Sequence, residues 1–279
     1  MSQPETKPIK EAPRRKSGGF LNAFLPNQAV SPTVMKMIVA VQIIGFLLVW
    51  IFSPFEVLPK PTEVFSALNS LWFKGGLGEE LLVSFSLNLK AILITSVISL
   101  GFAYLTVLPF FRPIVAAVSK GRFLSMVGFT FVFTLVLGGQ NLKLALLVFG
   151  MTVFFLTSMA SVVTEIPREK FDHARSLRMS EWRTVWEVVI VGTIDQAFEV
   201  LRQNAAIGWL MLTMVEGIVR SEGGIGALLL NEQKHFALPA VFAIQIVILI
   251  IGLCQDYLIG VIRKLVCPYA DLTLERAKK

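Results

Sequence analysis

Long apolar runs separated by short polar segments organise the chain. The runs occupy residues 34–52, 85–111, 123–138, 142–163, 197–219 and 238–262. A helix needs about 20 residues to cross about 30 Å of hydrocarbon, and most of the runs come close to this length. The pattern therefore predicts an all-α, polytopic membrane helix bundle with six transmembrane helices.

The third run is the weakest of the six. It has 16 residues, and only the segment 138–141 separates it from the fourth run. A re-entrant hairpin formed by these two runs is therefore an alternative to two full crossings. Because the hairpin would remove two crossings together, the sidedness of the other segments would not change.

The segments outside the apolar runs divide the chain further. The first 32 residues carry five prolines and a Ser-Gly-Gly sequence, which predicts a disordered basic tail. The membrane domain is expected to extend over 33–265, with a long polar loop at 164–191, and residues 266–279 form a second tail. Residues 58–73 predict a short helix along the membrane face, with Thr62 as its N-cap.

Composition and charge also indicate a bilayer as the solvent. Hydrophobic residues make up 54% of the 279 residues and charged residues 16%, which is too apolar for a soluble domain. Nineteen of the 26 Lys and Arg residues fall on the side of the N-terminus and five on the opposite side. This asymmetry predicts that both the N- and the C-terminus are cytoplasmic. The basic residues lie between apolar runs rather than on one folded face, so nucleic acid is not expected as a partner.

The sequence offers little catalytic chemistry. In this topology His173 and His235 fall on opposite sides of the membrane and cannot share a metal ion. Cys254 and Cys267 form no CxxC pair, and no HExxH, GxSxG or GxxxxGK[ST] motif is present. We therefore expect no enzymatic activity, metal or cofactor, and any ATP that drives the protein is bound by another chain.

The fifth run has an unusual polar face. Its members recur at helical spacing and include the candidates for a translocation path: Asp195, Glu199, Arg202, Thr213 and Glu216. Charged residues in a span turn toward partners or water, because inserting one into hydrocarbon costs roughly 2.5–3.5 kcal/mol. Glu199 and Arg202 can pair at i, i+3. An internal ion pair that only locks helices together is an equal alternative to a path.

Other polar residues in the runs carry weaker signals. For Asn88 with Lys90, the favoured interpretation is a lysine that reaches the membrane interface. Asp256 shows no pattern, and helix packing is its expected role.

Between the fourth and fifth runs, residues 165–187 hold five acidic and five basic side chains. Pro167 suits the first position of a helix, and a break at 178–180 would divide the segment into two short helices. The second has an apolar stripe that includes Trp182 and Trp186, whereas the first keeps its charges for water or a partner. A solvated loop without a special role is the alternative, but a helix pair indicates a docking surface.

This segment resembles the cytoplasmic EAA loop of binding-protein-dependent ABC importer permeases. That loop has the pattern E-A-A, three residues, G, nine residues, I-x-L-P. The sequence DHARSLRMS at 172–180, with VVIV at 188–191, follows the same order. Asp172 stands at the Glu place, His173 and Ala174 at the two Ala places, Arg178 at the Gly place and Val191 at the Pro place. Glycine allows a turn with positive φ, so Arg178 departs from the pattern at a position where such a turn is expected.

Three further stretches resemble the nitrate, sulfonate and taurine permease group within this family. They are LPKPTEVFSAL from Leu58, Arg175-Ser176-Leu177 followed by Ser180 and Trp182, and MVEGIV…GGIGALL at 214–229. Spacing and the order of the runs agree with this group over residues 58–262.

The resemblance implies a permease subunit of an ATP-driven importer in the bacterial inner membrane. It would move a small, nitrate- or sulfonate-like anion inward by alternating access. The implied partners are cytoplasmic ABC ATPase subunits, an extracytoplasmic substrate-binding protein and a second copy of the chain, all in or at membrane lipid. The loop would form coupling helices that sit in a groove of the ATPase, with Asp172, His173, Ala174, Arg175, Leu177 and Arg178 as the coupling positions.

Two other functions stay open. An ion-coupled secondary transporter or channel would use Asp195, Glu199 and Arg202 as a relay, and it would work without an ATPase. A non-transporting scaffold would be unaffected by charge reversal at Asp172 and Arg175.

Overall fold

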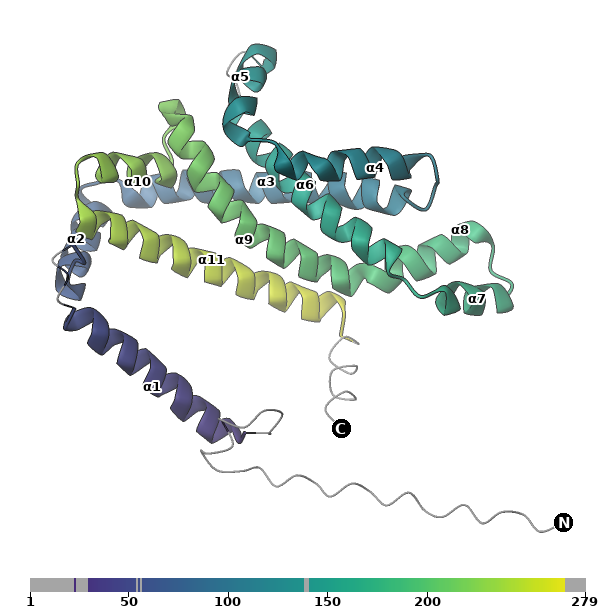
Figure 1. The fold of residues 1–279 in the computed structure, drawn as a ribbon, viewed down its shortest axis with the longest axis horizontal. Helices are drawn as coiled ribbons and strands as arrows, with labels where there is room; N and C mark the ends of the chain where they lie inside the picture. The colour runs from purple at the N-terminus through teal and green to yellow at the C-terminus, as the bar shows by residue number, and fades with distance from the viewer. Residues whose placement is uncertain (1–22, 24–29, 54, 56, 138–140, 269–279) are drawn as a thin grey trace, which may run out of the picture. The chain divides into compact units, whose positions relative to one another are not determined.

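The computed structural model describes residues 23, 30–53, 55, 57–137 and 141–268. All the regular elements in these ranges are helices (Figure 1). The chain forms two compact units, Met1–Pro61 and Thr62–Lys279, which are described separately. Most of the predicted tails (1–32 and 266–279) and the link at 138–140 lie outside the described residues.

The first unit contains α1 (Pro32–Ile51). The side chain of Ser31 caps this helix by accepting a hydrogen bond from Val34 N–H at 3.3 Å, and Pro32 takes the first helical position. None of its residues is buried within the described chain. With 20 residues, most of them apolar, α1 has the length and composition of a membrane span, which confirms the helix predicted from the first run.

Four long helices build the second unit: α3 (Leu77–Leu105), α6 (Leu142–Thr164), α9 (Ile194–Ile218) and α11 (Leu238–Val266). Like α1, the helices α3, α6 and α11 are long and apolar enough to cross a membrane. α9 has 25 residues and sufficient length, but it is more polar. The long apolar helices indicate a membrane-embedded protein.

The helix α3 begins and ends earlier than the apolar run at 85–111. It begins at Leu77, directly after Gly76 with a φ of +68°. Its first turns contain Glu79, Glu80 and Ser84, which interrupt the apolar pattern. The apolar run therefore did not include the start of the helix. The helix ends at Leu105, ahead of Pro109, whose missing N–H and ring do not fit a continued helix.

A sharp bend precedes the helix of the third apolar run. α4 (Phe111–Lys120) and the 3-10 turn η2 (Gly121–Phe123) precede α5 (Met126–Leu137), and the axes bend by 114° between the two parts. Leu124 is extended there, with φ −83° and ψ 137°. α5 alone has 12 residues, which is too short for a span. The helix predicted over 123–138 is present as α5, and it has the length of a span only together with α4.

The helices α3 and α6 run in the same direction, opposite to α9. Glu80 near the start of α3 and Lys143 near the start of α6 both bond to the turn at 223–224 that follows α9. Ala103 near the end of α3 packs in one cluster with Met159 near the end of α6. Since α3 and α6 start at the same end of the bundle, the chain through α4 and α5 returns from one end to the other.

The connecting helices mark the two ends of the bundle. α2 (Pro61–Phe73) and α10 (Ile225–Lys234) lie where α3 starts, and their residues Leu68 and Leu229 pack in the same cluster as Leu77. α7 (Arg168–Ser176) and α8 (Glu181–Thr184) lie at the other end, between α6 and α9 (Figure 1). The short helix predicted at 58–73 is confirmed as α2, although it begins at Pro61 without Thr62 as its cap.

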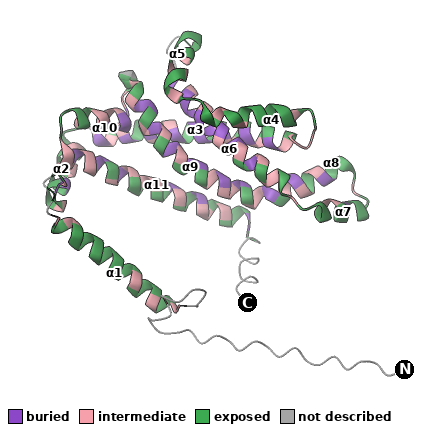
Figure 2. Cartoon of the chain, viewed as in Figure 1, coloured by how far each residue is buried: buried purple, intermediate pink, exposed green. Residues whose placement is uncertain are grey.

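The bundle buries polar side chains and exposes apolar ones. On α3 the buried residues include Ser84, Asn88, Thr95 and Ser99, whereas Leu82, Leu93 and Val97 are exposed at 70%, 60% and 75%. Figure 2 shows buried and exposed positions alternating along α3 and α11. This inverted pattern is expected where hydrocarbon rather than water covers the outer faces.

Candidate functional site

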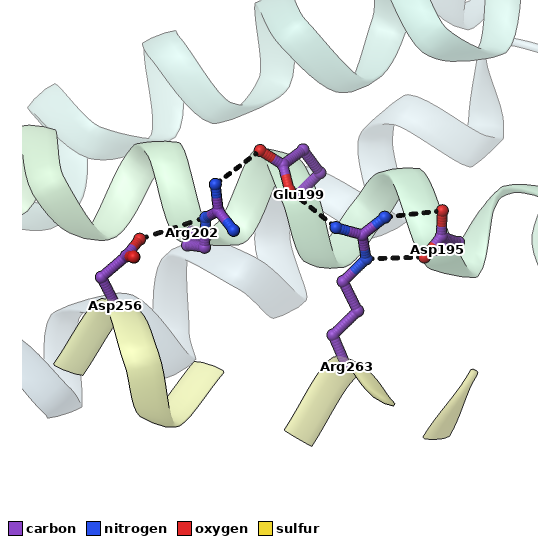
Figure 3. Close-up of polar contacts among 5 residues, drawn as sticks. All are labelled: Asp195, Glu199, Arg202, Asp256 and Arg263. Carbon is purple, nitrogen blue, oxygen red and sulfur yellow. Dashed lines mark hydrogen bonds and ion pairs between the residues drawn. The ribbon is translucent and has the colours of Figure 1, made fainter. Parts of the chain in front are cut away.

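Two arginines and three carboxylates join α9 to α11, and we call them the charge cluster (Figure 3). The guanidinium of Arg263 donates from Nε and Nη2 to the two carboxylate oxygens of Asp195, at 2.6 and 3.0 Å, and from Nη1 to Glu199 Oε2 at 2.9 Å. Arg202 lies 3.2 Å from Glu199 Oε1 and 3.1 Å from Asp256 Oδ1. The predicted pair of Glu199 and Arg202 is confirmed.

The charged groups of the charge cluster pair with one another. Its three carboxylates and two guanidiniums leave a net charge of −1. Because both arginines already face carboxylates, neither offers an unpaired positive charge to an anionic solute. The geometry of Asp195, Glu199 and Arg202 therefore favours the helix-locking alternative over the path.

The opposite end of α9 carries a buried carboxylate, Glu216, which is 0% exposed. Its Oε1 accepts a hydrogen bond from Ser84 Oγ at 2.7 Å and its Oε2 accepts one from Gly226 N–H at 2.9 Å. Ser84 Oγ in turn accepts a hydrogen bond from Ile225 N–H at 2.8 Å. These bonds satisfy the first N–H groups of α10, so Glu216 fixes the start of that helix.

A glycine turn closes around Glu216 and Glu80. Gly223 and Gly224 have φ values of +72° and +102°, and a Cβ at Gly224 would collide with the Glu216 carboxylate. Gly224 N–H donates a hydrogen bond to Glu80, and Lys143 Nζ donates one to the Gly223 carbonyl at 2.6 Å. The Lys143 side chain is only 1% exposed, so it lies inside the bundle.

A third polar contact joins α3, α9 and α11. Gln255 Oε1 accepts hydrogen bonds from Trp209 Nε1 at 2.7 Å and from Asn88 Nδ2 at 3.2 Å. Gly208 allows the helices to approach closely, because a Cβ there would lie 2.9 Å from Asn88 Oδ1. Asn88 is fully buried and belongs to this contact, whereas Lys90 is exposed, which is compatible with the interpretation that the lysine reaches the membrane interface.

Most of the buried polar atoms without a partner in the described part of the chain belong to the long helices, and one more, Thr184 Oγ1, lies in α8. Those of the long helices are Asn88 Oδ1, Thr95 Oγ1, Thr152 Oγ1 and both amide atoms of Asn204, from α3, α6 and α9. We call these four residues the polar centre. An unsatisfied buried polar group costs about 1–3 kcal/mol, so these atoms indicate a place for water or a polar solute. Thr213 does not join them, because its hydroxyl donates to the Leu210 carbonyl of its own helix at 3.0 Å.

The charged segment between α6 and α9 folds as two short helices with a break at 178–180, as predicted. Pro167 precedes α7 as its N-cap rather than taking the first helical position. At the other end of α7, Met179 N–H donates to the Ala174 carbonyl at 3.2 Å and Arg178 N–H to the Arg175 carbonyl at 2.9 Å. With Arg178 at a φ of +56°, this is a Schellman motif with arginine in the left-handed position.

Charged side chains connect the two short helices on their exposed surface. Arg175 lies 3.6 Å from Asp172 in α7 and 3.4 Å from Glu181 in α8. All three side chains are more than half exposed, so these ion pairs add little stability. They are accessible to a partner, whereas Ala174 is buried.

Apolar residues and a pocket lie on the same helix pair. Leu177, Trp182 and Trp186 are exposed at 58%, 72% and 59%. A pocket of about 380 Å³ lies between α7 and the π-helical turn η3 (Val185–Ile190), and His173, Leu177 and Met179 contribute to its lining. Exposed aromatic residues beside a pocket are typical of a protein-binding surface. We call the exposed surface of α7 and α8, with this pocket, the docking surface.

The chain matches no model of a known protein family, and no curated protein is significantly similar to it. Its functional interpretation therefore depends on three features of the chain itself: the docking surface, the charge cluster and the polar centre.

Proposed function

We propose that the chain is the membrane-spanning permease subunit of an ATP-driven ABC importer, in which the docking surface contacts a cytoplasmic ATPase. The observation that carries this proposal is the turn at Arg178. It has a positive φ at the place where the loop of the resembled permeases has glycine. The position of α7 and α8 at one end of the bundle, between α6 and α9, also fits a loop that transmits movement to the spans.

In this proposal the chain crosses the bacterial inner membrane six times, through α1, α3, the bent pair α4–α5, α6, α9 and α11. The common direction of α3 and α6 supports a return crossing through the bent pair. The excess of Lys and Arg on the side of the docking surface supports a cytoplasmic position for that surface and for both termini.

The polar centre is the proposed site of the solute path in each subunit. Its amide and hydroxyl groups can hydrogen-bond a small oxyanion such as nitrate or a sulfonate, in keeping with the resemblance. A second copy of the chain and an extracytoplasmic binding protein complete the proposed assembly. ATP is hydrolysed by the partner, so this subunit has no catalytic residue of its own.

Uptake by reconstituted liposomes tests the proposal. Liposomes that contain the chain alone should take up neither nitrate nor taurine under an ion gradient, whereas addition of an ATPase and a binding protein that copurify with it should give ATP-dependent uptake. Gradient-driven uptake by the chain alone would instead support an ion-coupled transporter.

Charge reversal on the docking surface tests coupling separately. Asp172→Arg and Arg175→Asp should each lower ATP-dependent uptake and ATPase copurification by about tenfold, because each replaces an exposed charge that a partner would face with its opposite. Lys264→Glu in the last turn of α11 is the matched control. It reverses an exposed charge at the same end of the bundle but outside α7 and α8. Unchanged uptake in both docking variants would contradict coupling through this surface.

A further inference from the structure

A second pocket lies at the same end of the bundle as the docking surface but is formed by other elements. Its volume is about 770 Å³, and residues of α4, the last turns of α6, the start of α7 and the segment after α3 line it. Because α3 and α6 end here, the pocket lies level with the ends of two helices that are long enough to cross a membrane. In a bilayer this is the depth of the lipid headgroups.

Two arginines contribute positive charge to this pocket. Arg112 donates from Nε to the Thr106 carbonyl at 3.0 Å, which holds the guanidinium at the pocket and leaves its Nη groups without a partner in the described residues. Arg168 forms no hydrogen bond or ion pair with any described side chain. The pocket also includes one carboxylate, Glu165, so its net charge is +1.

The remaining lining combines hydroxyl and apolar groups. Ser119, Thr157 and Ser161 place hydroxyls in it, while Val107 and Phe171 supply apolar surface. Apolar side chains at and just before α4 are also exposed, with Phe110 at 73% and Ile114 at 38%. These apolar side chains can contact the acyl chains of a lipid whose headgroup lies in the pocket.

We infer that this pocket binds the headgroup of an anionic phospholipid, with Arg112 and Arg168 contacting its phosphate. Basic pockets between helices at the cytoplasmic side of a membrane recognise such headgroups, and arginine matches phosphate geometry well. A lipid explains the apolar walls, which a free phosphate ion would leave unused. This inference requires membrane embedding but is independent of transport and of any ATPase.

Lipid retention by the purified full-length chain tests the inference. The protein in detergent is titrated with phosphatidylglycerol or phosphatidylcholine, and bound lipid is counted by native mass spectrometry. Wild type should bind phosphatidylglycerol in preference to phosphatidylcholine. Each of Arg112→Gln and Arg168→Gln should weaken phosphatidylglycerol binding by about fivefold, and the double variant by about 30-fold, on the scale of basic residues at anionic membranes.

Two controls separate this result from general charge effects and from misfolding. Arg183→Gln removes an exposed arginine of α8 that does not line the pocket, and it should leave binding unchanged. The double variant Arg112→Lys/Arg168→Lys keeps the charges and should retain most of the preference. Equal binding of the two lipids by wild type, or equal losses in the Arg183→Gln and pocket variants, would overturn the inference.

A photoreactive residue at Ser119 identifies the occupant directly. In membranes it should crosslink to labelled phosphatidylglycerol, and added inorganic phosphate should not compete. Crosslinking only to a protein, whether a second copy or another chain, would show that the pocket is a protein interface instead.

Discussion

Arg263 and Asp195 face each other across the α9–α11 interface through two parallel hydrogen bonds, at 2.6 and 3.0 Å. Parallel hydrogen bonds between a guanidinium and a carboxylate fix geometry as well as adding energy. The pair joins the last turn of α11 to the first turn of α9, close to where the chain leaves α7 and α8. Any displacement of the docking surface would therefore act on two long helices at once.

Removal of Arg263 should loosen this interface. We expect Arg263→Gln to lower the free energy of unfolding by about 1–3 kcal/mol, because it leaves Asp195 and part of Glu199 without their partner in a partly buried site. Denaturation in detergent measures the change. The double variant Asp195→Asn/Arg263→Gln should lose less than the sum of the two single changes, and Lys264→Gln, which removes the exposed neighbouring charge, should have little effect. Strict additivity would show that the pair is not coupled.

The left-handed turn at Arg178 should prefer glycine. Since a side chain in this conformation costs about 1–2 kcal/mol, Arg178→Gly should slow hydrogen exchange of the amides at the end of α7, and Arg178→Val should speed it. Arg183→Gly offers a contrast, because glycine within α8 removes helix propensity and should speed local exchange. Faster exchange in Arg178→Gly would mean that the arginine side chain itself holds the turn.

The glycine turn around Glu216 should tolerate no side chain. Gly224→Ala is expected to destabilise the protein by more than about 2 kcal/mol, because the residue has a φ of +102° and its Cβ would meet the Glu216 carboxylate. Gly260→Ala in α11 is the matched control, since nothing lies within 4 Å of a Cβ there. It should be neutral or stabilising by about 0.5–1 kcal/mol. Thermal unfolding of both variants in detergent measures the difference.

Substitution of Asn204 should change protein stability and transport activity in opposite directions. Its amide has no hydrogen-bond partner among the described residues although the side chain is buried. Asn204→Leu should therefore raise the free energy of unfolding by about 1 kcal/mol and, if the polar centre serves the solute, lower ATP-dependent uptake. Uptake at the wild-type level in the stabilised variant would remove the polar centre from the proposed path.

Local patterns in the sequence were sufficient to predict several helices and contacts of the fold. The apolar runs predicted α1, α6 and α11, because hydrocarbon thickness sets a minimum length for a span. The pairing of Glu199 with Arg202 could be predicted because residues at i and i+3 are neighbours on any helix. The break after α7 followed from its polar and apolar pattern, and the resemblance marked Arg178 as a place for positive φ.

Contacts between helices could not be predicted from such patterns. The pairing of Arg263 with Asp195 joins residues 68 positions apart in the chain, so no local pattern could predict it. The burial of Lys143 depends on a carbonyl 80 residues distant, at Gly223. Asp256 and Arg263 do lie seven residues apart on one face of α11, and that spacing was the available signal for a second charged stripe.

The bend between α4 and α5 also limits what can surround the protein. At Leu124 the backbone leaves the helix, and the first N–H groups of α5 have no partner within that helix. Hydrocarbon cannot form hydrogen bonds with these N–H groups. Only a few residues further on, however, Phe131 and Leu135 are each 70% exposed, and their apolar side chains favour hydrocarbon over water. Two incompatible environments thus meet within about two helical turns. A neighbouring subunit that supplied hydrogen-bond acceptors to the bend and an apolar wall to α5 would satisfy both.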